Sequence, residues 1–287
     1  MNKSYLFAVI GDPVGHSLSP VMQNAAFKHL NLAGEYAAIH VKREDLEAFT
    51  RQARKNLKGF NITVPHKNAV LPFLDSISET AALAESVNTV TADENGRLHG
   101  DSTDGIGLEL ALKEELQFDP RGKTVCFIGC GGVVPALAFH LAFCGVCSIR
   151  ILNRTVEKAE DLCRRLQKRF PQLSCQGASL EDPVRTAAFL AESSLAVQCT
   201  SLGLKEEDPS PVDPALFPAG GLVLYDTIYK NTRFQQIARD KGIPVANGLT
   251  MLLYQGAASF RIWTGEEAPV QVMRDALFTA FREQQKS

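Results

Sequence analysis

The sequence predicts an α/β protein of two domains, one of which is a doubly wound parallel sheet. A chain of 287 residues is long enough for two ordinary domains. Apolar runs of strand length alternate with amphipathic stretches of helix length, which is typical of strands and helices wound together. Turn residues at 118–122 interrupt this alternation, and the apolar strand that opens at Lys123 starts a new unit.

The first half contains four predicted strands and a hairpin. The strands are predicted near 5–10, 36–41, 60–64 and 87–92, and the helices near 20–31, 43–55 and 77–85. The turn at 93–96 favours a hairpin into 97–100.

The second half resembles a doubly wound sheet. After a helix at about 105–116, strands are predicted at 123–128 and near 148–152, 195–199, 222–225 and 243–246, separated by helices such as 156–169. Two long helices, at about 249–262 and 269–284, end the chain without a further strand. We expect them to pack back on the first domain.

The composition favours a globular protein whose overall charge is too small to attract nucleic acid or a membrane surface. Hydrophobic residues make up 45% of the chain, charged residues 22%, and the net charge is −2. Such a balance predicts no binding to nucleic acid or to a membrane surface, so any anion must be captured locally. The apolar stretch near the N-terminus is too short for a signal peptide or a membrane span.

The cysteines predict a cytoplasmic protein with reduced thiols. Seven is an odd number, and a chain of this length can form a core without disulfide bonds. Cys144 and Cys147 have the spacing of a redox or metal pair, but they lie at a predicted helix end with no second ligand pair nearby. We therefore predict no metal site. Cys130 lies in a packed turn, where thiols are more often inert than sensitive to oxidation.

A glycine-rich loop follows the strand that ends at Ile128. Gly129, Gly131 and Gly132, with Val133 after them, permit a tight turn. A pyrophosphate can then approach backbone N–H groups at a helix N-terminus, where the helix dipole favours an anion. The third position of the usual pattern holds Val134 instead of a small residue, so the helix needs compensating packing to stay close to the strand.

A cation follows the next strand, where a NAD site typically has an acid to hold the ribose 2′-hydroxyl. This strand ends in Asn153-Arg154-Thr155. A guanidinium makes charge-assisted bonds to phosphate oxygens, so Arg154 and the Thr155 hydroxyl favour the 2′-phosphate of NADP(H). Alternatively, Thr155 only caps the helix 156–169 and Arg154 is a solvated side chain.

Two serines at a strand-to-helix turn are suited to bind a small carboxylate. Ser17 and Ser19 lie two residues apart, beside a helix whose first position is Pro20. Ser19 alone is explained as the helix N-cap. Capping does not explain Ser17 or the glycine-rich approach to it, so we favour a neutral anion pocket.

The segment at 59–67 combines a polar strand face with a lysine. Strand alternation puts Asn61, Thr63 and Pro65 on one face, which can line a cleft. Lys67 follows at a predicted helix start, where the helix dipole disfavours a cation. That position indicates a role in proton transfer more than a structural one.

Asn88 lies in another predicted strand, and Asp104 opens the helix at 105. Taken alone, Asp104 is best explained as an N-cap. Taken with Lys67, it is a carboxylate that can orient the lysine during ketone reduction, provided that the fold brings the two together.

In this order, the segments resemble the shikimate dehydrogenase family over nearly the whole chain. The matching motifs are Ser17-Leu-Ser19-Pro20, Asn61-Ile-Thr63-Val-Pro65-His-Lys67, Asn88-Thr89, Asp104-Gly105, the glycine loop, Asn153-Arg154-Thr155, Thr200-Ser-Leu-Gly203 and Gly248-Leu-Thr-Met251-Leu-Leu-Tyr-Gln255-Gly256-Ala257.

The resemblance implies a site for shikimate and 3-dehydroshikimate in the first domain. Ser17 and Ser19 would bind the substrate carboxylate. Lys67 would be the acid/base partner of the reacting oxygen, with Asp104 beside it. Ring hydroxyls would be held by Asn61, Thr63, Asn88, Asp104 and Gln255, and the loop of Tyr229 would approach substrate and nicotinamide.

The resemblance also implies a Rossmann-type NADP(H) domain at 105–248 and a discontinuous substrate domain made of 1–104 and 249–287. Catalysis would take place in the cleft between the domains. We expect a monomer or a homodimer that acts in aromatic amino acid (chorismate) biosynthesis. The cofactor residues would be Gly129, Gly131, Gly132, Val133, Asn153, Arg154, Thr155, Thr200, Ser201, Gly203, Gly248 and Met251.

Three segments depart from the family pattern: Val133-Val134-Pro135 replaces small and basic residues, the Tyr229–Thr232 loop is two residues shorter, and Asn247 replaces a common Asp. Two alternative functions stay open. One is a quinate or dual quinate/shikimate dehydrogenase, because the same carboxylate pocket can hold the saturated ring. The other is a catalytically silent NADP-binding sensor, which the altered loops favour and the intact Lys67 and Asp104 oppose.

Overall fold

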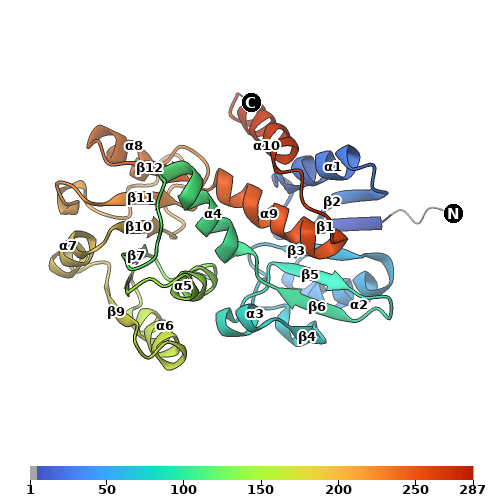
Figure 1. Cartoon of the computed structure of the whole chain (residues 1–287), viewed down its shortest axis with the longest axis horizontal. Helices are drawn as coiled ribbons and strands as arrows, with labels where there is room; N and C mark the ends of the chain where they lie inside the picture. Colours follow the sequence, from blue (N-terminus) through green and yellow to red (C-terminus); the bar gives the residue numbers. More distant parts are fainter. Residues whose placement is uncertain (1–4, 287) are drawn as a thin grey trace. The chain divides into compact units, whose positions relative to one another are not determined.

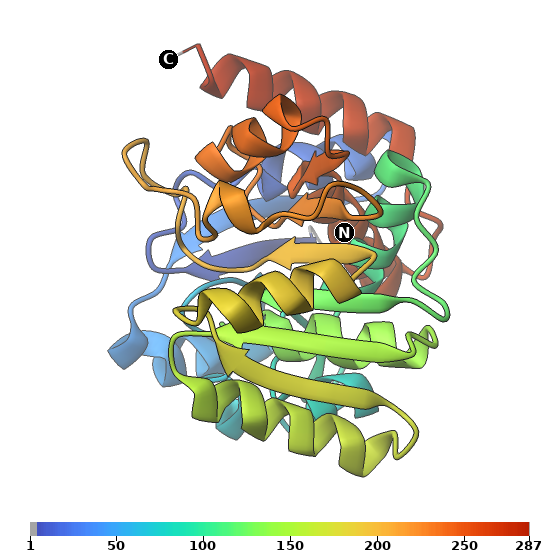
Figure 2. The ribbon, with the colours of Figure 1, turned by 90° about the vertical axis from the view of Figure 1, so that its left-hand side faces the viewer.

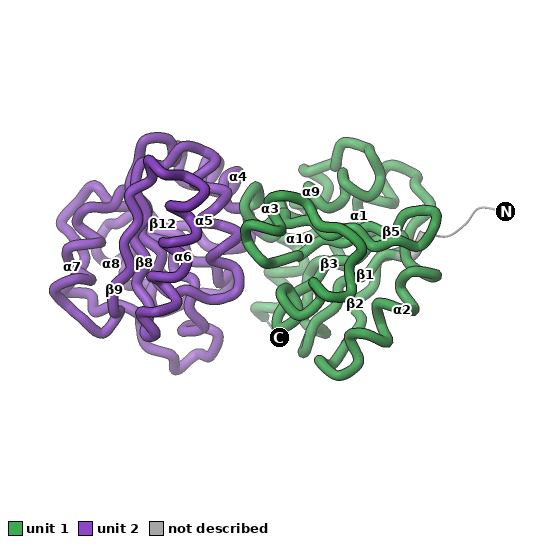
Figure 3. Tube along the Cα trace, turned by 90° about the horizontal axis from the view of Figure 1, so that it is seen from below, with its two compact units in different colours: residues 1–107, 252–287 green, residues 108–251 purple. Residues whose placement is uncertain are grey.

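The computed structural model describes residues 5–286, and the chain divides into two compact units. The first unit consists of 1–107 and 252–287 and the second of 108–251 (Figure 3). Each boundary lies inside a helix, one in α4 (Asp104–Leu116) and one in α9 (Leu249–Thr264). The boundaries expected from the sequence, 104/105 and 248/249, fall at the starts of these same helices.

The first unit is built on a mixed sheet of six strands in the order β2-β1-β3-β5-β6-β4 (Figure 1). β1 pairs in parallel with β2 and β3, whereas β5 is antiparallel to both β3 and β6. The strands are β1 (Tyr5–Gly11), β2 (Gly34–His40), β3 (Gly59–Ile62), β4 (Ser76–Ile77), β5 (Thr89–Ala92) and β6 (Leu98–Asp101).

Helices cover both faces of this sheet, as the burial of its central strand β1 shows. Phe7, Ala8, Val9 and Ile10 are all buried, a run expected when both faces of a strand are covered. Ala8 and Ile10 belong to the same hydrophobic core cluster as Leu46 of α2. The helices of this unit, besides parts of α4 and α9, are α1 (Ser19–His29), η1 (Arg43–Asp45), α2 (Leu46–Asn56), η2 (Leu71–Phe73), α3 (Glu79–Ala84) and α10 (Val270–Gln284).

The C-terminal helices return to the first unit, as the sequence predicted. α10 packs against α1, and the Gln23 side chain donates to the Gly256 carbonyl of α9 at 2.9 Å. The indole of Trp263 donates to the Val90 carbonyl at 3.0 Å. The end of the chain therefore completes the core around strands formed at its beginning.

The second unit is a parallel sheet of six strands in the order β12-β11-β10-β7-β8-β9, seen in Figure 2. This is the doubly wound order, and it reverses between β7 and β10. Loops at the carboxyl ends of the two strands flanking such a reversal form the usual ligand crevice. The strands are β7 (Thr124–Ile128), β8 (Ser148–Asn153), β9 (Ser174–Ser179), β10 (Leu195–Gln198), β11 (Val223–Asp226) and β12 (Val245–Asn247).

Helices on both sides bury the central strands of this sheet. Val125, Cys126, Phe127 and Ile128 of β7 are all fully buried. The helices are α5 (Val134–Phe143), α6 (Val156–Arg169), α7 (Pro183–Glu192), η3 (Pro214–Leu216) and α8 (Arg233–Asp240). The predicted α/β class with a Rossmann-type second domain is confirmed.

Two strands, β4 and β9, were missed by the sequence analysis, because neither carries an apolar run. β4 has only two residues and lies at a sheet edge. β9 reads Ser-Cys-Gln-Gly-Ala-Ser and also lies at an edge, where few side chains need to be apolar. Among the described residues, no helix has the length and apolarity needed to cross a membrane.

The docking of α9 predicts a large loss of stability for Phe260→Ala. Phe260 is fully buried, and its ring centroid lies 5.0 Å from that of Phe27. Truncating such a residue costs about 3–5 kcal/mol. Ile262, on the same helix but 40% exposed, is the matched control, and Ile262→Ala is expected to change stability by less than about 0.5 kcal/mol. Urea unfolding followed by circular dichroism measures both, and equal losses would contradict this account of the packing.

Candidate functional site

The centre of the candidate site is an ion pair between Lys67 and Asp104. Lys67 Nζ lies 2.5 Å from Asp104 Oδ2, and the two side chains are 16% and 6% exposed. Lys67 follows β3 in a turn, and its carbonyl accepts the Val87 N–H at 2.9 Å. Asp104 is the first residue of α4. The contact that the sequence left conditional is therefore present.

Asn88 holds the carboxylate of this pair from the other side. Its Nδ2 donates to Asp104 Oδ1 at 3.0 Å and to Gln255 Oε1 at 3.2 Å. Its Oδ1 accepts the Thr103 N–H at 2.8 Å. Asn88 thus fixes the start of α4 and joins Asp104 to Gln255 of α9.

Two interpretations of this region are wrong. No α-helix begins at Lys67 in the described chain, because the next helical element is the single turn η2 at Leu71–Phe73, so the helix-dipole argument does not apply. Asp104 is not merely an N-cap, because it lies inside α4 and both of its carboxylate oxygens bind side chains, those of Lys67 and Asn88.

Asn61 connects the same network to β2 and α9. Its Nδ2 donates to the Asn88 carbonyl at 3.0 Å and to Ser259 Oγ at 3.0 Å, and its Oδ1 accepts the Tyr36 hydroxyl at 2.7 Å. Burial raises the pKa of Tyr36 well above its usual value, and a hydrogen bond with the Ser19 side chain partly offsets that rise. Through Tyr36, the serine turn and Asn61 belong to one buried polar cluster.

The end of β1, which leads towards the serine turn, lies against Thr63, the residue that follows β3. A Cβ at Gly11 would lie 2.4 Å from Thr63 Cγ2, so only glycine allows this approach. α1 begins at Ser19 itself, so the expected N-cap role of Ser19 is wrong. Instead, the Ser17 hydroxyl accepts the Ser19 N–H at 3.3 Å.

The first unit therefore gathers neutral hydroxyl and amide groups around one ammonium–carboxylate pair. Such a set can bind a small polar anion by hydrogen bonds while the lysine exchanges a proton with it. The structure links the predicted residues Ser17, Ser19, Asn61, Lys67, Asn88, Asp104 and Gln255 through this network and places Thr63 beside Gly11.

Sequence analysis missed Tyr36 and Ser259. Ser259 follows Gln255 by four residues on α9, which puts both on one helix face, and this spacing was a usable signal. Tyr36 had no such signal, because a tyrosine in a strand usually belongs to the core.

The glycine loop in the second unit is packed against the loop after β10. Gly129 has φ +98°, and a Cβ there would lie 2.9 Å from Thr200 Cγ2, so glycine is required for both reasons. The Cys130 N–H donates to Asn153 Oδ1 at 3.0 Å. Gly131 and Gly132 are exposed just before α5, which suits the approach of a phosphate.

The end of β8 offers a cation and an uncommitted hydroxyl. Arg154 and Thr155 are both exposed. Thr155 occupies the N-cap position of α6, but within the described chain its side chain accepts no capping hydrogen bond. The capping alternative therefore explains the position of Thr155 and not its hydroxyl. These groups fit a phosphorylated ribose.

The unusual Val134 is packed inside the second unit. Val134 is the first residue of α5 and is fully buried.

Burial of Cys130 raises its pKa to about 11, so its thiol is protonated near neutral pH and poorly reactive. The expectation of an inert thiol agrees with this environment.

The other predicted cofactor residues also lie in the second unit. Thr200, Ser201 and Gly203 follow β10, and Gly248 and Met251 lie at the end of β12 and in α9. Tyr229 follows β11 in the same unit, and burial raises its pKa.

Fold and residues together define a class, the two-domain α/β proteins that combine a dinucleotide-binding domain with an acid/base site in a separate domain. Family models match three segments of the chain: a shikimate dehydrogenase substrate binding domain at 9–90, a shikimate/quinate 5-dehydrogenase domain at 109–187 and a shikimate 5′-dehydrogenase C-terminal domain at 248–278.

Whole-chain comparisons agree with these matches. The chain is 40% identical to the shikimate dehydrogenase (NADP(+)) of Desulfitobacterium hafniense, over 96% of this chain and 97% of the relative. It resembles the solved Listeria monocytogenes shikimate 5-dehydrogenase in complex with shikimate and NAD, with a TM-score of 0.88, 34% identity and 96% and 97% coverage. It also resembles Corynebacterium glutamicum quinate dehydrogenase in complex with NAD, with a TM-score of 0.86, 27% identity and 96% and 99% coverage. The chain belongs to the shikimate dehydrogenase family.

The buried network predicts that Asn61→Ala destabilises the protein by about 2–4 kcal/mol, because several buried polar groups lose their partner at once and each such group costs about 1–3 kcal/mol. Asn56, an exposed asparagine at the end of α2, is the control. Thermal unfolding of both variants tests the prediction, and an Asn61→Ala protein as stable as Asn56→Ala would show that the network contributes no stability.

Proposed function

We propose that this protein is an NADP-dependent shikimate dehydrogenase, which reversibly reduces 3-dehydroshikimate to shikimate in aromatic amino acid (chorismate) biosynthesis. The observation that carries the proposal is the largely buried Lys67–Asp104 pair, 2.5 Å apart and surrounded by neutral hydrogen-bonding groups. Membership of the shikimate dehydrogenase family supports it.

In the proposed reduction, the Lys67 ammonium gives its proton to the ring oxygen that becomes the alcohol. When bound, NADPH supplies the hydride to the carbon of that carbonyl. Asp104 orients the ammonium group, and solvent returns the proton to Lys67 afterwards. In the oxidation of shikimate, the neutral amine accepts the hydroxyl proton.

The remaining polar residues of the first unit position the ring. We assign the substrate carboxylate to the hydroxyls of Ser17 and Ser19. We assign the ring hydroxyls of the substrate to Thr63, Asn88, Gln255 and Asn61. Asn61 is already bonded to Tyr36 and Ser259, so its main effect is to hold the shape of the site. Tyr229 of the second unit is assigned to the substrate.

The second unit is assigned to NADP(H). Backbone N–H groups of 131–133 at the start of α5 would hold the pyrophosphate, and Arg154 with Thr155 would hold the 2′-phosphate. We also assign to NADP(H) binding the residues Asn153, Thr200, Ser201, Gly203, Gly248 and Met251.

Quinate is the second candidate substrate, supported by the structural likeness to a quinate dehydrogenase. Assays of shikimate and quinate, each with NADP and with NAD, separate the two activities through the absorbance of the reduced cofactor. A catalytically silent NADP-binding sensor would show cofactor binding with no turnover of either substrate.

We propose a cytoplasmic location, because all seven cysteines are free thiols and an enzyme of this kind needs the cellular NADPH pool. For assembly we propose a monomer or a homodimer, which light scattering measures directly.

Lys67→Ala is expected to lower the turnover of 3-dehydroshikimate by about 10²-fold or more, the scale of lost general acid/base catalysis. Lys67→Arg should lose a similar factor, because a guanidinium keeps the charge but does not give up its proton near neutral pH. Lys42→Ala, which removes an exposed lysine of the same unit, is the control. Undiminished turnover in Lys67→Ala would remove Lys67 from the chemistry.

Arg154→Ala is expected to weaken NADP binding by about 10–100-fold, because a hydrogen bond to a charged group contributes about 1.5–3 kcal/mol. Binding of NAD, which lacks the 2′-phosphate, should change little and serves as the internal control. Fluorescence titration of both reduced cofactors provides the comparison. Equal losses for the two cofactors would place Arg154 outside the 2′-phosphate site.

A further inference from the structure

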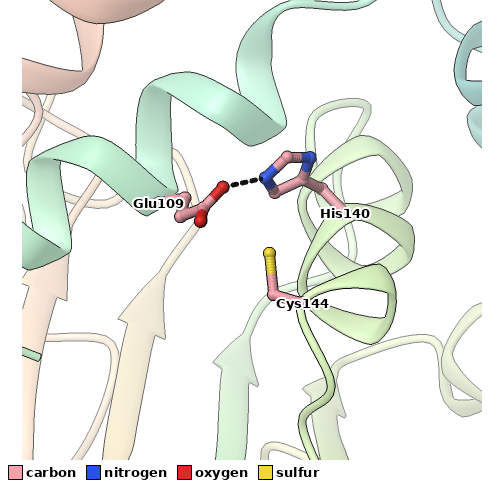
Figure 4. A group of neighbouring side chains, drawn as sticks. All are labelled: Glu109, His140 and Cys144. Carbon is pink, nitrogen blue, oxygen red and sulfur yellow. Dashed lines mark hydrogen bonds and ion pairs between the residues drawn. The ribbon is translucent and has the colours of Figure 1, made fainter. Parts of the chain in front are cut away.

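A second cluster of reactive side chains lies in the second unit, among residues that the proposed reaction does not use. It consists of Glu109 on α4, His140 on α5 and Cys144, the residue that follows α5 (Figure 4). One ligand atom from each residue lies within 4.8 Å of the other two. All three residues are partly buried.

The sequence spacing explains how two of these groups meet. His140 and Cys144 are four residues apart, so they project from the same side of α5, and Figure 4 shows both directed towards Glu109. The His140 Nε2 and a Glu109 carboxylate oxygen are 2.7 Å apart. This contact joins α4 to α5 through two residues that are 31 positions apart in the chain.

We propose that Glu109, His140 and Cys144 form a binding site for a zinc-class divalent cation. An imidazole nitrogen, a thiolate sulfur and a carboxylate oxygen are the three donor types that Zn²⁺ accepts in proteins. Mg²⁺ and Ca²⁺ prefer oxygen donors only, so this mixed set selects against them. With three protein ligands, the fourth position of a tetrahedral ion is filled by water.

Charge and access support this assignment. A divalent cation would neutralise the Glu109 carboxylate and the Cys144 thiolate, and the thiol proton would leave to solvent on binding. The side chains of His140 and Glu109 are 22% and 36% exposed, so an ion can reach the site from solvent.

Small adjustments are sufficient for coordination. Zinc lies about 2.0–2.3 Å from its nitrogen, oxygen and sulfur ligands. Two ligand atoms of a tetrahedral site are therefore farther apart than the 2.7 Å between His140 Nε2 and the Glu109 carboxylate oxygen. They are also closer together than the 4.8 Å within which the three ligand atoms of the cluster lie. The ion would therefore separate His140 from Glu109 slightly. It would also cross-link α4 to α5, the helix that begins at the glycine loop.

A metal ion at this cluster would contradict the prediction that the chain has no metal site. Cys144 attracted attention in the sequence because of Cys147, but Cys147 is exposed and is not a member of the cluster. The partners that the sequence appeared to lack are a histidine one helical turn earlier and a glutamate from another helix.

The test uses the full chain, stripped of metal by a chelator, and Co²⁺ as a spectroscopic probe for zinc. We expect one equivalent of Co²⁺ to produce a thiolate-to-cobalt charge-transfer band, which one equivalent of Zn²⁺ then removes. Cys144→Ala should abolish the band, and His140→Ala should weaken Zn²⁺ binding by about 100-fold or more, since even changes outside the ligand shell cost about 10–100-fold.

Cys147→Ala is the matched control, because it removes an exposed thiol three residues away and should leave the band intact. Circular dichroism of the metal-free variants verifies folding, and Cys144→Ser replaces Cys144→Ala if the alanine variant is unfolded. Zn²⁺ should also raise the melting temperature of the wild type and not that of the Cys144 variant. A missing charge-transfer band in the wild type, or a band that survives Cys144→Ala and disappears in Cys147→Ala, would overturn the proposal.

Discussion

The ion pair between Lys67 and Asp104 is the interaction on which the proposed chemistry depends. A pair with so little exposure is stable only when further hydrogen bonds satisfy its remaining donors and acceptors. Asn88 supplies one of these bonds to Asp104 and is itself held by the Thr103 N–H. Positioning of a single proton donor therefore requires the end of β3, the start of α4 and the start of β5 together.

The proposed anion sites of the two units differ in their chemistry. In the first unit, neutral hydroxyl and amide groups surround one ammonium group, which suits a small hydroxylated acid. In the second unit, backbone N–H groups at a helix N-terminus and the exposed Arg154 suit phosphates. The net charge of −2 agrees with this reliance on local groups. One glycine in each unit, Gly11 in the first and Gly129 in the second, lets a neighbouring segment come so close that a Cβ would block it.

Helix α4 connects the proposed catalysis and the proposed metal site through its own sequence. Asp104 at its first residue pairs with Lys67, while Glu109, in its second turn, lies beside His140 and Cys144. A cation at Glu109 would link α4 to α5 within the second unit, and the site would then contribute to stability without touching the substrate.

Local patterns in the sequence were sufficient for most of the elements, the α/β class, the glycine loop, and Arg154 with Thr155 at a strand end, because each depends on residues close together in the chain. The family resemblance added roles for residues such as Tyr229 and Gln255. The resemblance also implied that Asp104 lies beside Lys67, and the structure brings the two side chains into contact across 37 residues. Tertiary structure alone decided that Tyr36 joins Ser19 to Asn61 and that Cys144 meets Glu109. It also showed that Ser19 and Asp104 lie inside their helices and are not N-caps. Propensity and periodicity describe the neighbours of a residue along the chain, whereas these contacts depend on strand register and helix packing, which bring distant residues together only when the whole unit has folded.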